Sequence, residues 1–598
     1  MKSITTELSQ RVSAAIAAAF GPETADADPA VRQSQNPQFG DYQSNCAMAL
    51  AKRVGEKPRD VATRIIEQLK IDDMCEQPEI AGPGFVNLRL KSGYMAGSLA
   101  AVPPTDGDEQ YDRLGIDTAA RPDVVAIDMS SPNLAKEMHV GHLRSTVIGD
   151  SVARILEFAG HKVERINHVG DWGTQFGMLV AHLHSERPEV LADPQHLKLG
   201  DLESFYREAK AHFDRDEQFA DEARKTVVKL QQGDPQTVTI WHAFCDESLR
   251  HCHAIYDRLG IEGLIDRGES FYNDRLGDVV EELRKLGMVE KSEGADCIFL
   301  DGFRSREGEP LPMMVRKSDG GFNYATTDLA AVQHRVRDLS ATRLIYVVGA
   351  PQKQHFDMLF AAARQAGWAP EGVRLEHLAF GSMLGADGKP FKTREGGTVK
   401  LKDLLDEAVS RARAIVEENI VDISKSRDMT VEEVNEIAET VGISAVKYFD
   451  LSHNLSTDYR FEWDHMLSMD GNTAPYMLYA YARIRSIGRK AGIDYADLPA
   501  DAALMLEHPA ELELAKGLLR FREVIDQIVA DLQPNALTDY LFDLSRRFNR
   551  FYDRKLGVRV IDAESDGLRN SRLRLCDLAA RTLKTGLQLL GISTLERM

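Results

Sequence analysis

One junction in the chain, between a buried strand and a helix, limits what the sequence can fold into. The run Val-Val-Ala-Ile at residues 124–127 is apolar and mostly β-branched, as in a parallel strand that is covered on both faces. From Leu143 to Leu156, apolar residues recur every three or four positions, which predicts a helix. A buried strand that leads into a helix is the first half of a βαβ unit and predicts an α/β fold.

The segment between that strand and that helix contains His-Val-Gly-His at residues 139–142. At a helix start, free backbone N–H groups and the positive end of the helix dipole attract a phosphate. Gly141 lets a phosphate approach the backbone, and His139 and His142 can donate hydrogen bonds to a phosphoryl group. The alternatives are helix caps or a metal pair. Zinc is the weaker alternative, because no Cys-x-x-Cys pair or suitably spaced third ligand accompanies the histidines.

The strand at Val124–Asp128 lies in a region, residues 120–400, where strands and helices alternate. This pattern predicts an α/β core of the Rossmann type, with a doubly wound parallel sheet. Further strands are expected at Lys162–Asn167, Arg343–Gly349 and residues 373–380. Between the second and third strands, residues 180–310 are highly charged and helical in pattern. We expect them to form a helical insertion that splits the sheet in two.

Three further regions flank the α/β core. They are a small α/β module at residues 1–105, a helical connector at 401–468 and a helical bundle at 469–598. In the first module we expect a helix at Ile4–Phe20 and two short strands around a Gly-Pro-Gly turn at residues 82–84. In the bundle, the apolar stripe that begins at Leu514 indicates core packing rather than a binding surface.

The formal net charge of −20 over 598 residues argues against nucleic acid as a partner for the surface as a whole. Charge acts locally, however, because 0.1 M salt screens it within about 10 Å. Residues 541–585 contain eleven Lys or Arg against six Asp or Glu, so this part of the chain is basic and suits RNA.

The sequence contains no signal-peptide pattern near its first residues and no apolar run of membrane-spanning length. Its six cysteines lack the spacing of a disulfide framework, which fits a reducing compartment. We therefore expect a cytoplasmic protein that does not contact a membrane.

A second phosphate-binding candidate follows the strand expected at residues 373–380. The segment 381–397 places Lys389, Lys392 and Arg394 between glycines. Cations on a loop at the carboxyl end of a parallel sheet can clamp a triphosphate. Taken alone, the segment fits a solvated surface loop better. Two phosphate-suited loops from different halves of one sheet together favour a nucleotide site.

The two loops together resemble the signatures of a known family. Residues 139–142 look like the His-Ile-Gly-His signature of class I aminoacyl-tRNA synthetases. Lys-Pro-Phe-Lys-Thr at residues 389–393 occupies the place of their Lys-Met-Ser-Lys-Ser signature. That divergent loop, with Ser-Pro-Asn-Leu-Ala-Lys at residues 131–136, resembles the arginyl-tRNA synthetases. Further similar motifs lie at residues 167–177, 324–330, 352–356 and 474–484.

The resemblance implies ATP-dependent activation of L-arginine and transfer of the arginyl group to the terminal ribose of tRNA(Arg). His139 and His142 would act at the α-phosphate, with Gly141 beside the nucleotide. Lys389 and Lys392 would hold the leaving pyrophosphate, and Lys136 at the end of residues 131–136 would add an ATP contact. Catalysis would rest on positioning and electrostatics. Mg²⁺ would arrive with ATP, and no protein-bound metal is expected.

For the amino acid, the resemblance implies a pocket for a guanidinium, whose donors lie in one plane and need carboxylate acceptors. Asp328, with Tyr324 one turn before it, matches the guanidinium site of the family. The other expected arginine contacts are Asp128, Ser131, Asn133 and Gln352. Without the resemblance, Tyr324 and Asp328 fit a helix-start cap. Unpaired carboxylates reject neutral analogues strongly, so no editing domain is expected.

The first module resembles a domain of the family that touches the tRNA elbow. Its expected tRNA contacts are Asn36, Phe39 and Gln43. An aromatic ring can stack on an unpaired base, and amides can read the edge of a base. The alternative is a polar turn without function.

The C-terminal bundle resembles the anticodon-binding domain of the family. Its expected tRNA contacts are Arg547, Arg550 and Arg554, which interleave with aromatic residues. On a helix, those aromatics can equally belong to the core, with the arginines solvated.

By analogy with this class we expect a monomer. Two rival functions remain open. One is a nucleotidyltransferase that activates a small acid without RNA, and the other is a tRNA-binding paralogue with an inactive site. Pyrophosphate exchange that proceeds fully without tRNA favours the first rival, and a negligible effect of His142→Ala on arginylation favours the second.

Overall fold

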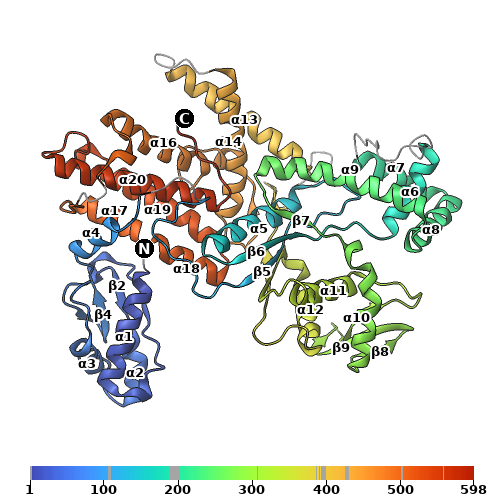
Figure 1. Ribbon diagram of the computed structural model, residues 1–598, viewed down its shortest axis with the longest axis horizontal. Coiled ribbons are helices and arrows are strands. Elements are labelled where there is room, and N and C mark those ends of the chain that lie inside the picture. Colours follow the sequence, from blue (N-terminus) through green and yellow to red (C-terminus); the bar gives the residue numbers. More distant parts are fainter. Residues whose placement is uncertain are drawn as a thin grey trace.

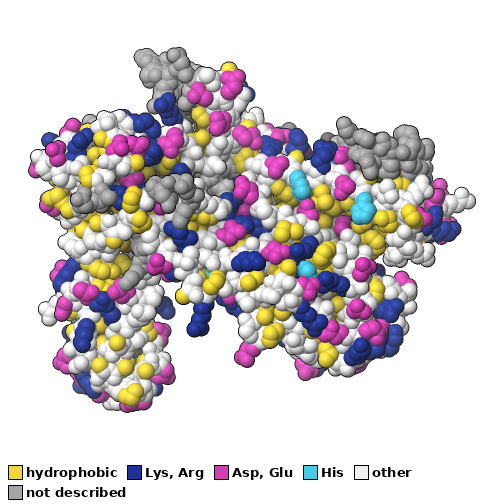
Figure 2. Space-filling model, viewed as in Figure 1, with side chains coloured by type: hydrophobic (Ala, Val, Ile, Leu, Met, Phe, Trp, Pro, Cys, Tyr) yellow, Lys and Arg dark blue, Asp and Glu magenta, His cyan; other side chains and the backbone are white. Residues whose placement is uncertain are grey.

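The structure is a computed structural model in which a helical C-terminal part lies between a sheet-containing core and a smaller N-terminal module (Figure 1). It describes residues 3–104, 110–187, 202–305, 307–385, 387–389, 391, 399–423, 430–499, 503–556 and 558–597. None of the helices in these ranges is long and apolar enough to cross a membrane. On the face shown in Figure 2, acidic and basic side chains are interspersed, so the net charge of −20 does not gather there into one acidic surface.

Five parallel strands form the central sheet, in the order β12-β11-β5-β6-β7. Their bounds are β5 Val124–Asp128, β6 Lys162–Asn167, β7 Leu264–Asp266, β11 Arg343–Gly349 and β12 Arg374–Phe380. The doubly wound sheet and the four strands predicted from the sequence are confirmed. The strand order reverses between β5 and β11, and at such a switch point the carboxyl ends of the strands open a crevice for ligands.

Alternate residues of β5 enter two different hydrophobic cores. Val125 and Ile127 pack with α5 (Val140–Phe158) and the C-terminal helices. Ala126 instead packs with helices on the other face, α11 (Tyr324–Arg337) and α12 (Lys353–Gln365). In Figure 1, α5 lies on one side of β5 and β6, and α11 and α12 lie on the other. The strand and the helix that flank the His-Val-Gly-His sequence are therefore both fixed by packing.

The first part of the segment between β6 and β11 is helical, as expected. Its helices are α6 Thr174–Glu186, α7 Leu202–Arg215, α8 Glu217–Gln231 and α9 Pro235–Leu259. They extend to the right of the sheet in Figure 1. After residue 260 the expectation of a purely helical insertion is wrong, because β7 adds an edge strand to the central sheet.

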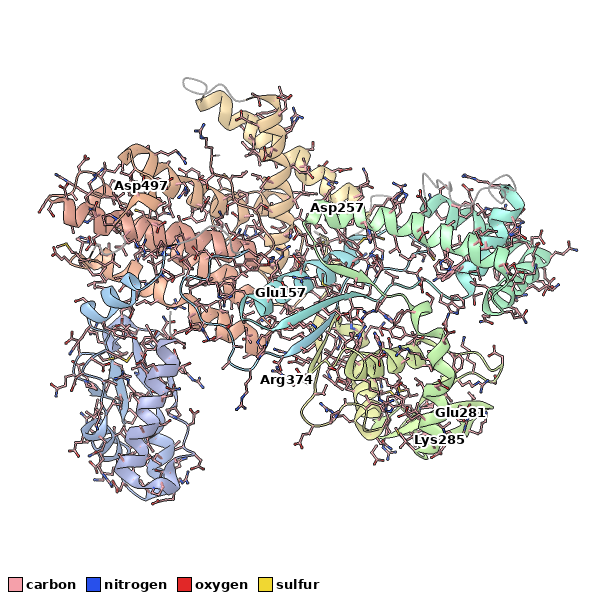
Figure 3. All side chains as sticks on the ribbon, in the orientation of Figure 1. Glu157, Asp257, Glu281, Lys285, Arg374 and Asp497 are labelled. Carbon is pink, nitrogen blue, oxygen red and sulfur yellow. The ribbon has the colours of Figure 1, made fainter. Side chains whose placement is uncertain are left out.

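A second sheet, antiparallel and in the order β10-β9-β8, completes this segment. Its strands and the helix before it are α10 Asn273–Lys285, β8 Val289–Ser292, β9 Ala295–Arg304 and β10 Pro310–Arg316. Some of the charged residues in the segment that we expected to be helical lie on α10, where Glu281 and Lys285 point outward (Figure 3). A three-residue strand such as β7 shows no alternating pattern, and its pairing with β6 defines it instead.

The N-terminal module has four helices and a small antiparallel sheet in the order β1-β2-β4-β3. Their bounds are α1 Ile4–Phe20, β1 Val31–Gln33, β2 Tyr42–Ser44, α2 Cys46–Val54, α3 Pro58–Gln68, β3 Glu79–Ala81, β4 Phe85–Leu88 and α4 Ser92–Ala100. The predicted first helix and the two strands around the Gly-Pro-Gly turn are confirmed. Glu523 fastens this module to the C-terminal part by accepting from the Thr5 N–H (2.7 Å) and the Tyr42 hydroxyl (3.0 Å).

Helices dominate after the sheet, as predicted. They are α13 Leu401–Ile423, α14 Val431–Leu451, α15 Trp463–Met466, α16 Ala474–Ala491, α17 Pro509–Leu519, α18 Phe521–Asp531, α19 Asn535–Phe551 and α20 Asp566–Leu589. A two-residue strand pair, β13 Met383–Leu384 with β14 Tyr459–Arg460, connects this part to the end of β12. Leu514 and Ile525 are buried, so the core interpretation of the apolar stripe is confirmed.

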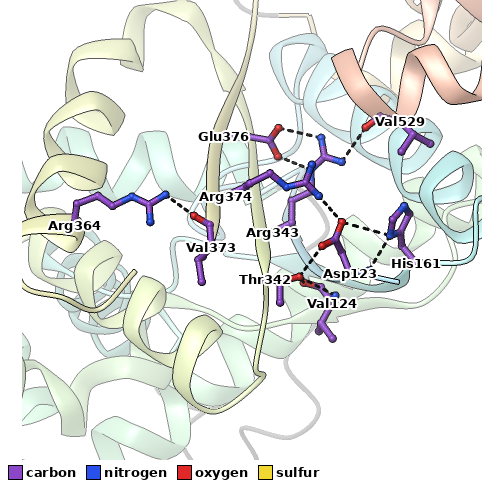
Figure 4. A network of polar contacts seen from close by, with 10 residues as sticks. All are labelled: Asp123, Val124, His161, Thr342, Arg343, Arg364, Val373, Arg374, Glu376 and Val529. Atoms are coloured by element: carbon purple, nitrogen blue, oxygen red, sulfur yellow. Dashed lines mark hydrogen bonds and ion pairs between the residues drawn. The ribbon is translucent and has the colours of Figure 1, made fainter. Parts of the chain in front are cut away.

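A polar network at the amino end of the sheet joins the strands to the C-terminal part (Figure 4). Arg343 is fully buried; it donates to both carboxylate oxygens of Glu376, with 3.0 Å from Nη2 to Oε1, and to the backbone oxygen of Val529 on α18 (2.9 Å). Arg374 lies in the same network but is half exposed, and it pairs with Asp123.

The network predicts unequal costs for two similar substitutions. Arg343→Met should lower the free energy of unfolding by about 3 kcal/mol, because it leaves the charge of Glu376 and the backbone oxygen of Val529 without their buried partner. Arg374→Met should cost less than about 1 kcal/mol, because solvent screens its pair with Asp123. Urea unfolding of both variants of the full chain measures the difference. Equal losses of unfolding free energy would contradict the stabilising role assigned to buried Arg343.

Candidate active site

The turn that follows β5 has an uncommon backbone conformation. Ser130 and Ser131 have φ angles of 66° and 49°, in the left-handed region that residues other than glycine rarely adopt. The Ser131 N–H donates to Asn167 Oδ1 (2.9 Å), and the Ser130 hydroxyl hydrogen-bonds the Tyr256 hydroxyl (2.8 Å). Such strain persists only where the surroundings enforce it, which is common at functional sites.

His139 and His142 cap the N-terminus of α5 reciprocally. His139 Nδ1 accepts the N–H of Gly141 (3.0 Å), and His142 Nδ1 accepts the N–H of His139 (3.1 Å). A Cβ on Gly141 would lie 2.8 Å from Cε1 of His139, so this cap requires glycine. The cap interpretation is confirmed, and it does not compete with ligand binding, because each cap uses only the Nδ1 side of a ring.

The protonation of His142 follows from its surroundings. Burial, and then the neighbouring His139, lowers the pKa of His142 to about 3, so the ring is neutral at physiological pH. Since Nδ1 accepts a hydrogen bond, the neutral ring carries its proton on Nε2. His142 therefore offers an N–H donor without a positive charge at the start of α5.

The second predicted loop returns to the first through backbone pairing. The N–H of Val140 donates to the oxygen of Val399 (3.1 Å), and the N–H of Leu401 donates to the oxygen of Met138 (2.9 Å). The backbones of His139 and Lys400 form an antiparallel bridge between these bonds. The chain that leaves the second loop thus runs directly beside the His-Val-Gly-His sequence.

The three predicted phosphate-binding lysines have different surroundings. Lys389 is exposed in a tight turn, where its backbone oxygen accepts the N–H of Gly385 (2.7 Å). Lys392 lies outside the described residues. The ammonium of exposed Lys136 lies 4.8 Å from the ring centre of Tyr206 on α7, so a helix of the insertion contacts this candidate.

Asp328 lies in the first turns of α11 between two histidines. Its Oδ2 is 2.6 Å from His355 Nε2, and its Oδ1 is 3.7 Å from His168 Nε2. Tyr324, one turn earlier, is 62% exposed, and its ring meets His355 edge-on at 5.0 Å. Neither residue is the N-cap of α11, which is Asn323. The alternative that Tyr324 and Asp328 cap this helix is therefore wrong.

Glu269, a carboxylate near Asp328, is not among the site residues predicted from the sequence. Burial, and then the negative charges of Asp328 and Asp171, raises the pKa of Glu269 to about 7. Glu269, Tyr324 and Trp172 line a cavity of about 810 Å³. A carboxylate whose pKa is raised by burial and by neighbouring negative charges, beside a cavity, attracts a cation. Glu269 follows β7, so recognising β7 as part of the main sheet would have placed it at the carboxyl edge.

The other predicted arginine contacts differ in the partners they already have. Asp128 is buried and accepts from Ser131 Oγ (2.8 Å) and from Nη2 of the buried Arg335 (2.6 Å), so each of its oxygens has a protein partner. Asn133 Oδ1 accepts the backbone N–H two residues later (3.0 Å). Gln352 is exposed at the end of a short turn before α12.

A row of polar contacts joins the end of β5 to Asp328. Ser131 Oγ donates to Asp128 and accepts the backbone N–H of His168 (3.2 Å). The His168 ring in turn faces Asp328. The structure therefore brings the turn before α5 and the acidic residues together at one switch point, although they are far apart in the sequence.

The predicted tRNA contacts of the N-terminal module lie on one short segment. Asn36 Oδ1 accepts the N–H of Gln38 (3.0 Å) and starts a single turn. Phe39 in that turn is 43% exposed. Gln43 donates its side-chain amide to Asn87 (2.7 Å). Among these three, Phe39 has the exposed apolar surface that stacking requires.

The predicted contacts of the C-terminal part are less alike. Arg547 is half-buried and forms ion pairs with Asp543 (2.7 Å) and Glu513 (2.8 Å). Arg550 is exposed, and the side chain of Arg554 lies outside the described part of the chain. The phenylalanines interleaved with these arginines are buried, so for them the core alternative is confirmed.

Three family models match the chain. The model described as tRNA synthetases class I (R), catalytic domain, matches residues 110–463, which is more than half of the chain. The Arginyl tRNA synthetase N terminal domain matches residues 6–90, and the DALR anticodon binding domain matches residues 477–598.

Known proteins and solved structures match over the full length. The arginine–tRNA ligase of Nostoc sp. is 54% identical over 592 residues, 99% of each chain. The crystal structure of arginyl-tRNA synthetase from Plasmodium falciparum has a TM-score of 0.86 at 30% identity, and the arginyl-tRNA synthetase of Thermus thermophilus has 0.80 at 25%; both cover 100% of each chain. With this agreement of sequence, fold and domain order, the chain belongs to the arginyl-tRNA synthetases of class I.

Proposed function

We propose that the chain uses ATP to convert L-arginine into arginyl-adenylate and then transfers the arginyl group to the 3′-terminal ribose of tRNA(Arg). Family membership supports the reaction. The observation that carries the assignment of residues is the row of contacts from Asp128 through Ser131 and His168 to Asp328. It joins the turn that precedes the phosphate-suited helix start to an acidic pocket that suits a guanidinium.

In the first step, the arginine carboxylate attacks the α-phosphorus of ATP, and pyrophosphate leaves. His142 donates Nε2–H to an α-phosphate oxygen as negative charge accumulates there, and His139 lies beside it. Lys136, Lys389 and Lys392 neutralise the leaving pyrophosphate. No side chain forms a covalent bond to the substrate, and Mg²⁺ enters as part of the ATP complex. In the second step, a ribose hydroxyl attacks the activated carbonyl, and AMP leaves.

Selection of arginine follows from charge and shape. Asp328 and Glu269 supply carboxylates that match the planar donors of a guanidinium, and the exposed ring of Tyr324 can cover its flat face. A lysine ammonium is a compact charge and cannot satisfy both carboxylates in this way. We assign Asp128 a positioning role, in which it holds Ser131 in its strained turn.

The remaining candidate residues are proposed to contact the amino and carboxylate groups of arginine or the tRNA. Ser131, Asn133 and Gln352 are the proposed contacts for the amino and carboxylate groups of arginine. The proposed tRNA contacts are Asn36, Phe39, Gln43, Arg547, Arg550 and Arg554.

We retain the domain limits inferred from the sequence as proposals: 1–105 for a tRNA-binding module, 120–400 for catalysis, 401–468 for a connector and 469–598 for anticodon binding. The proposed state is a monomer, by analogy with this class. The proposed compartment is the cytoplasm, because all six cysteines are free and buried.

Exchange of pyrophosphate into ATP, measured for each amino acid with and without tRNA, tests the proposed function. We expect exchange with arginine and with no other amino acid, and only when tRNA(Arg) is present. Exchange that runs equally well without tRNA would indicate the rival nucleotidyltransferase instead.

Asp328→Asn tests the guanidinium pocket, because it removes a charge and keeps the size of the side chain. We expect the KM for arginine to rise by about 100-fold or more, since the substrate guanidinium loses a charged acceptor, and the KM for ATP to change by less than about threefold. Asp338→Asn, at the far end of the same helix, is the control and should change neither constant. Equal changes in both KM values for Asp328→Asn would remove Asp328 from the pocket.

The raised pKa of Glu269 predicts that arginine binding depends on pH. A bound guanidinium favours the carboxylate form of Glu269, whose pKa in the free protein is raised to about 7, so binding releases a proton. The KM for arginine should therefore rise as the pH falls below about 7, by up to about tenfold per pH unit. Glu269→Gln should weaken binding and flatten this dependence. A variant that kept the slope would show that another group titrates.

A further inference from the structure

Two histidines of the helical insertion meet away from the catalytic cavity. His182 lies near the C-terminal end of α6, and His212 lies in the last turn of α7; both helices belong to the insertion on the right of Figure 1. Their Nδ1 atoms are 3.3 Å apart. Glu186, one turn after His182, completes a group of three side chains whose nearest ligand atoms all lie within 4.8 Å of one another. No other group of this kind occurs among the described residues.

The distance between the histidines fits a shared metal ion. Zinc lies about 2.0–2.1 Å from an imidazole nitrogen, and two such ligands at a tetrahedral angle are roughly 3.3–3.4 Å apart. Two imidazoles and a carboxylate are a ligand set found in three-ligand zinc sites. The observed separation therefore needs little movement of either ring to admit the ion.

The surroundings of His212 hold its ring in place. The ring stacks on Phe219 of α8, with centres 3.8 Å apart and planes within 3° of parallel. Its other nitrogen, Nε2, lies 3.8 Å from Oδ2 of Asp216. A carboxylate behind the second nitrogen of a histidine is a common feature of metal sites, because it fixes the tautomer and raises the basicity of the ligating nitrogen.

His182 is held in place as well. It is only 5% exposed, packed against Phe205 and Phe219, and its Nε2 has no hydrogen-bond partner among the described residues. Its other nitrogen, Nδ1, faces Nδ1 of His212, so the two rings present the same kind of ligand atom to the space between them.

We propose that His182, Glu186 and His212 bind one divalent transition metal ion of the zinc type, with Asp216 as an outer partner of His212. The ion fastens the end of α6 to α7. It plays no part in the chemistry of aminoacylation. It stabilises α7, whose Tyr206 ring contacts the ammonium group of Lys136. The proposal departs from the expectation of no protein-bound metal, because its ligands come from two helices that only the fold brings together.

Calorimetric titration of the full chain with Zn²⁺, after treatment with a chelator, tests the proposal. The unaltered chain should bind Zn²⁺ saturably, and His212→Gln should lose one equivalent of that binding. Asp216→Asn keeps the helix cap that Asp216 provides to α8 and should weaken the site by about tenfold. Co²⁺ in place of Zn²⁺ should give the visible absorption of a tetrahedral site in the unaltered chain and not in His212→Gln.

His251→Gln is the matched control, because His251 also lies one turn from a carboxylate, Glu247 (3.3 Å), but no second histidine joins that pair. It should bind Zn²⁺ like the unaltered chain. Circular dichroism and the unfolding temperature in the presence of chelator should be the same for His212→Gln and the unaltered chain, which separates loss of the site from loss of the fold. Zn²⁺ binding by His212→Gln with unchanged stoichiometry and affinity, or no saturable binding by the unaltered chain, overturns the proposal.

Discussion

A single buried guanidinium holds the elements around the candidate active site together. Arg144 follows His142 by two residues, and it donates to the backbone oxygen of Gly381 after β12 (2.6 Å) and pairs with Asp450 of α14 (3.2 Å). A buried charge is tolerated only with such partners, and removing any of them is costly. The start of α5, the loop after β12 and the connector helix therefore cannot shift independently. The start of α5 and Gly381, the first residue after β12, are held together by this packing and do not need a ligand to bring them together.

The strained turn after β5 is likewise stabilised by hydrogen bonds between buried or half-buried polar groups. A left-handed backbone costs about 1–3 kcal/mol at a residue other than glycine, and a hydrogen bond contributes about 0.5–1.5 kcal/mol. Ser130 and Ser131 each make at least three hydrogen bonds, to partners on β5, β6, α5 and α9, so these bonds are sufficient to offset the strain. Glycine would adopt the turn more easily but would lose the hydroxyl contacts. Serine ties the turn to the residues that surround the substrate pocket.

Much of this arrangement could be predicted from local sequence. The run at Val124–Asp128 is apolar enough, and long enough, to be identified as a strand before any pairing is known. Arg144 and Glu269 could not be found in this way. Arg144 looks like a polar interruption of an apolar helix, and Glu269 lies after β7, a strand defined by its neighbour in the sheet. Residues whose role depends on partners far away in the chain carry no local pattern.

The charge of the C-terminal part shows how far composition can be taken. Its excess of basic residues predicted a region suited to RNA, and the DALR anticodon binding domain matches there, yet several of those arginines are used inside the protein. Arg572 pairs with buried Glu511 (2.7 Å), and Arg581 pairs with Asp112 (3.0 Å) in the segment that leads into the sheet. The first pair lies within the C-terminal part, the second joins it to the segment before the sheet, and both present little charge to RNA. Among the described residues, Arg550 on α19 is one of the exposed basic side chains that a polyanion can reach.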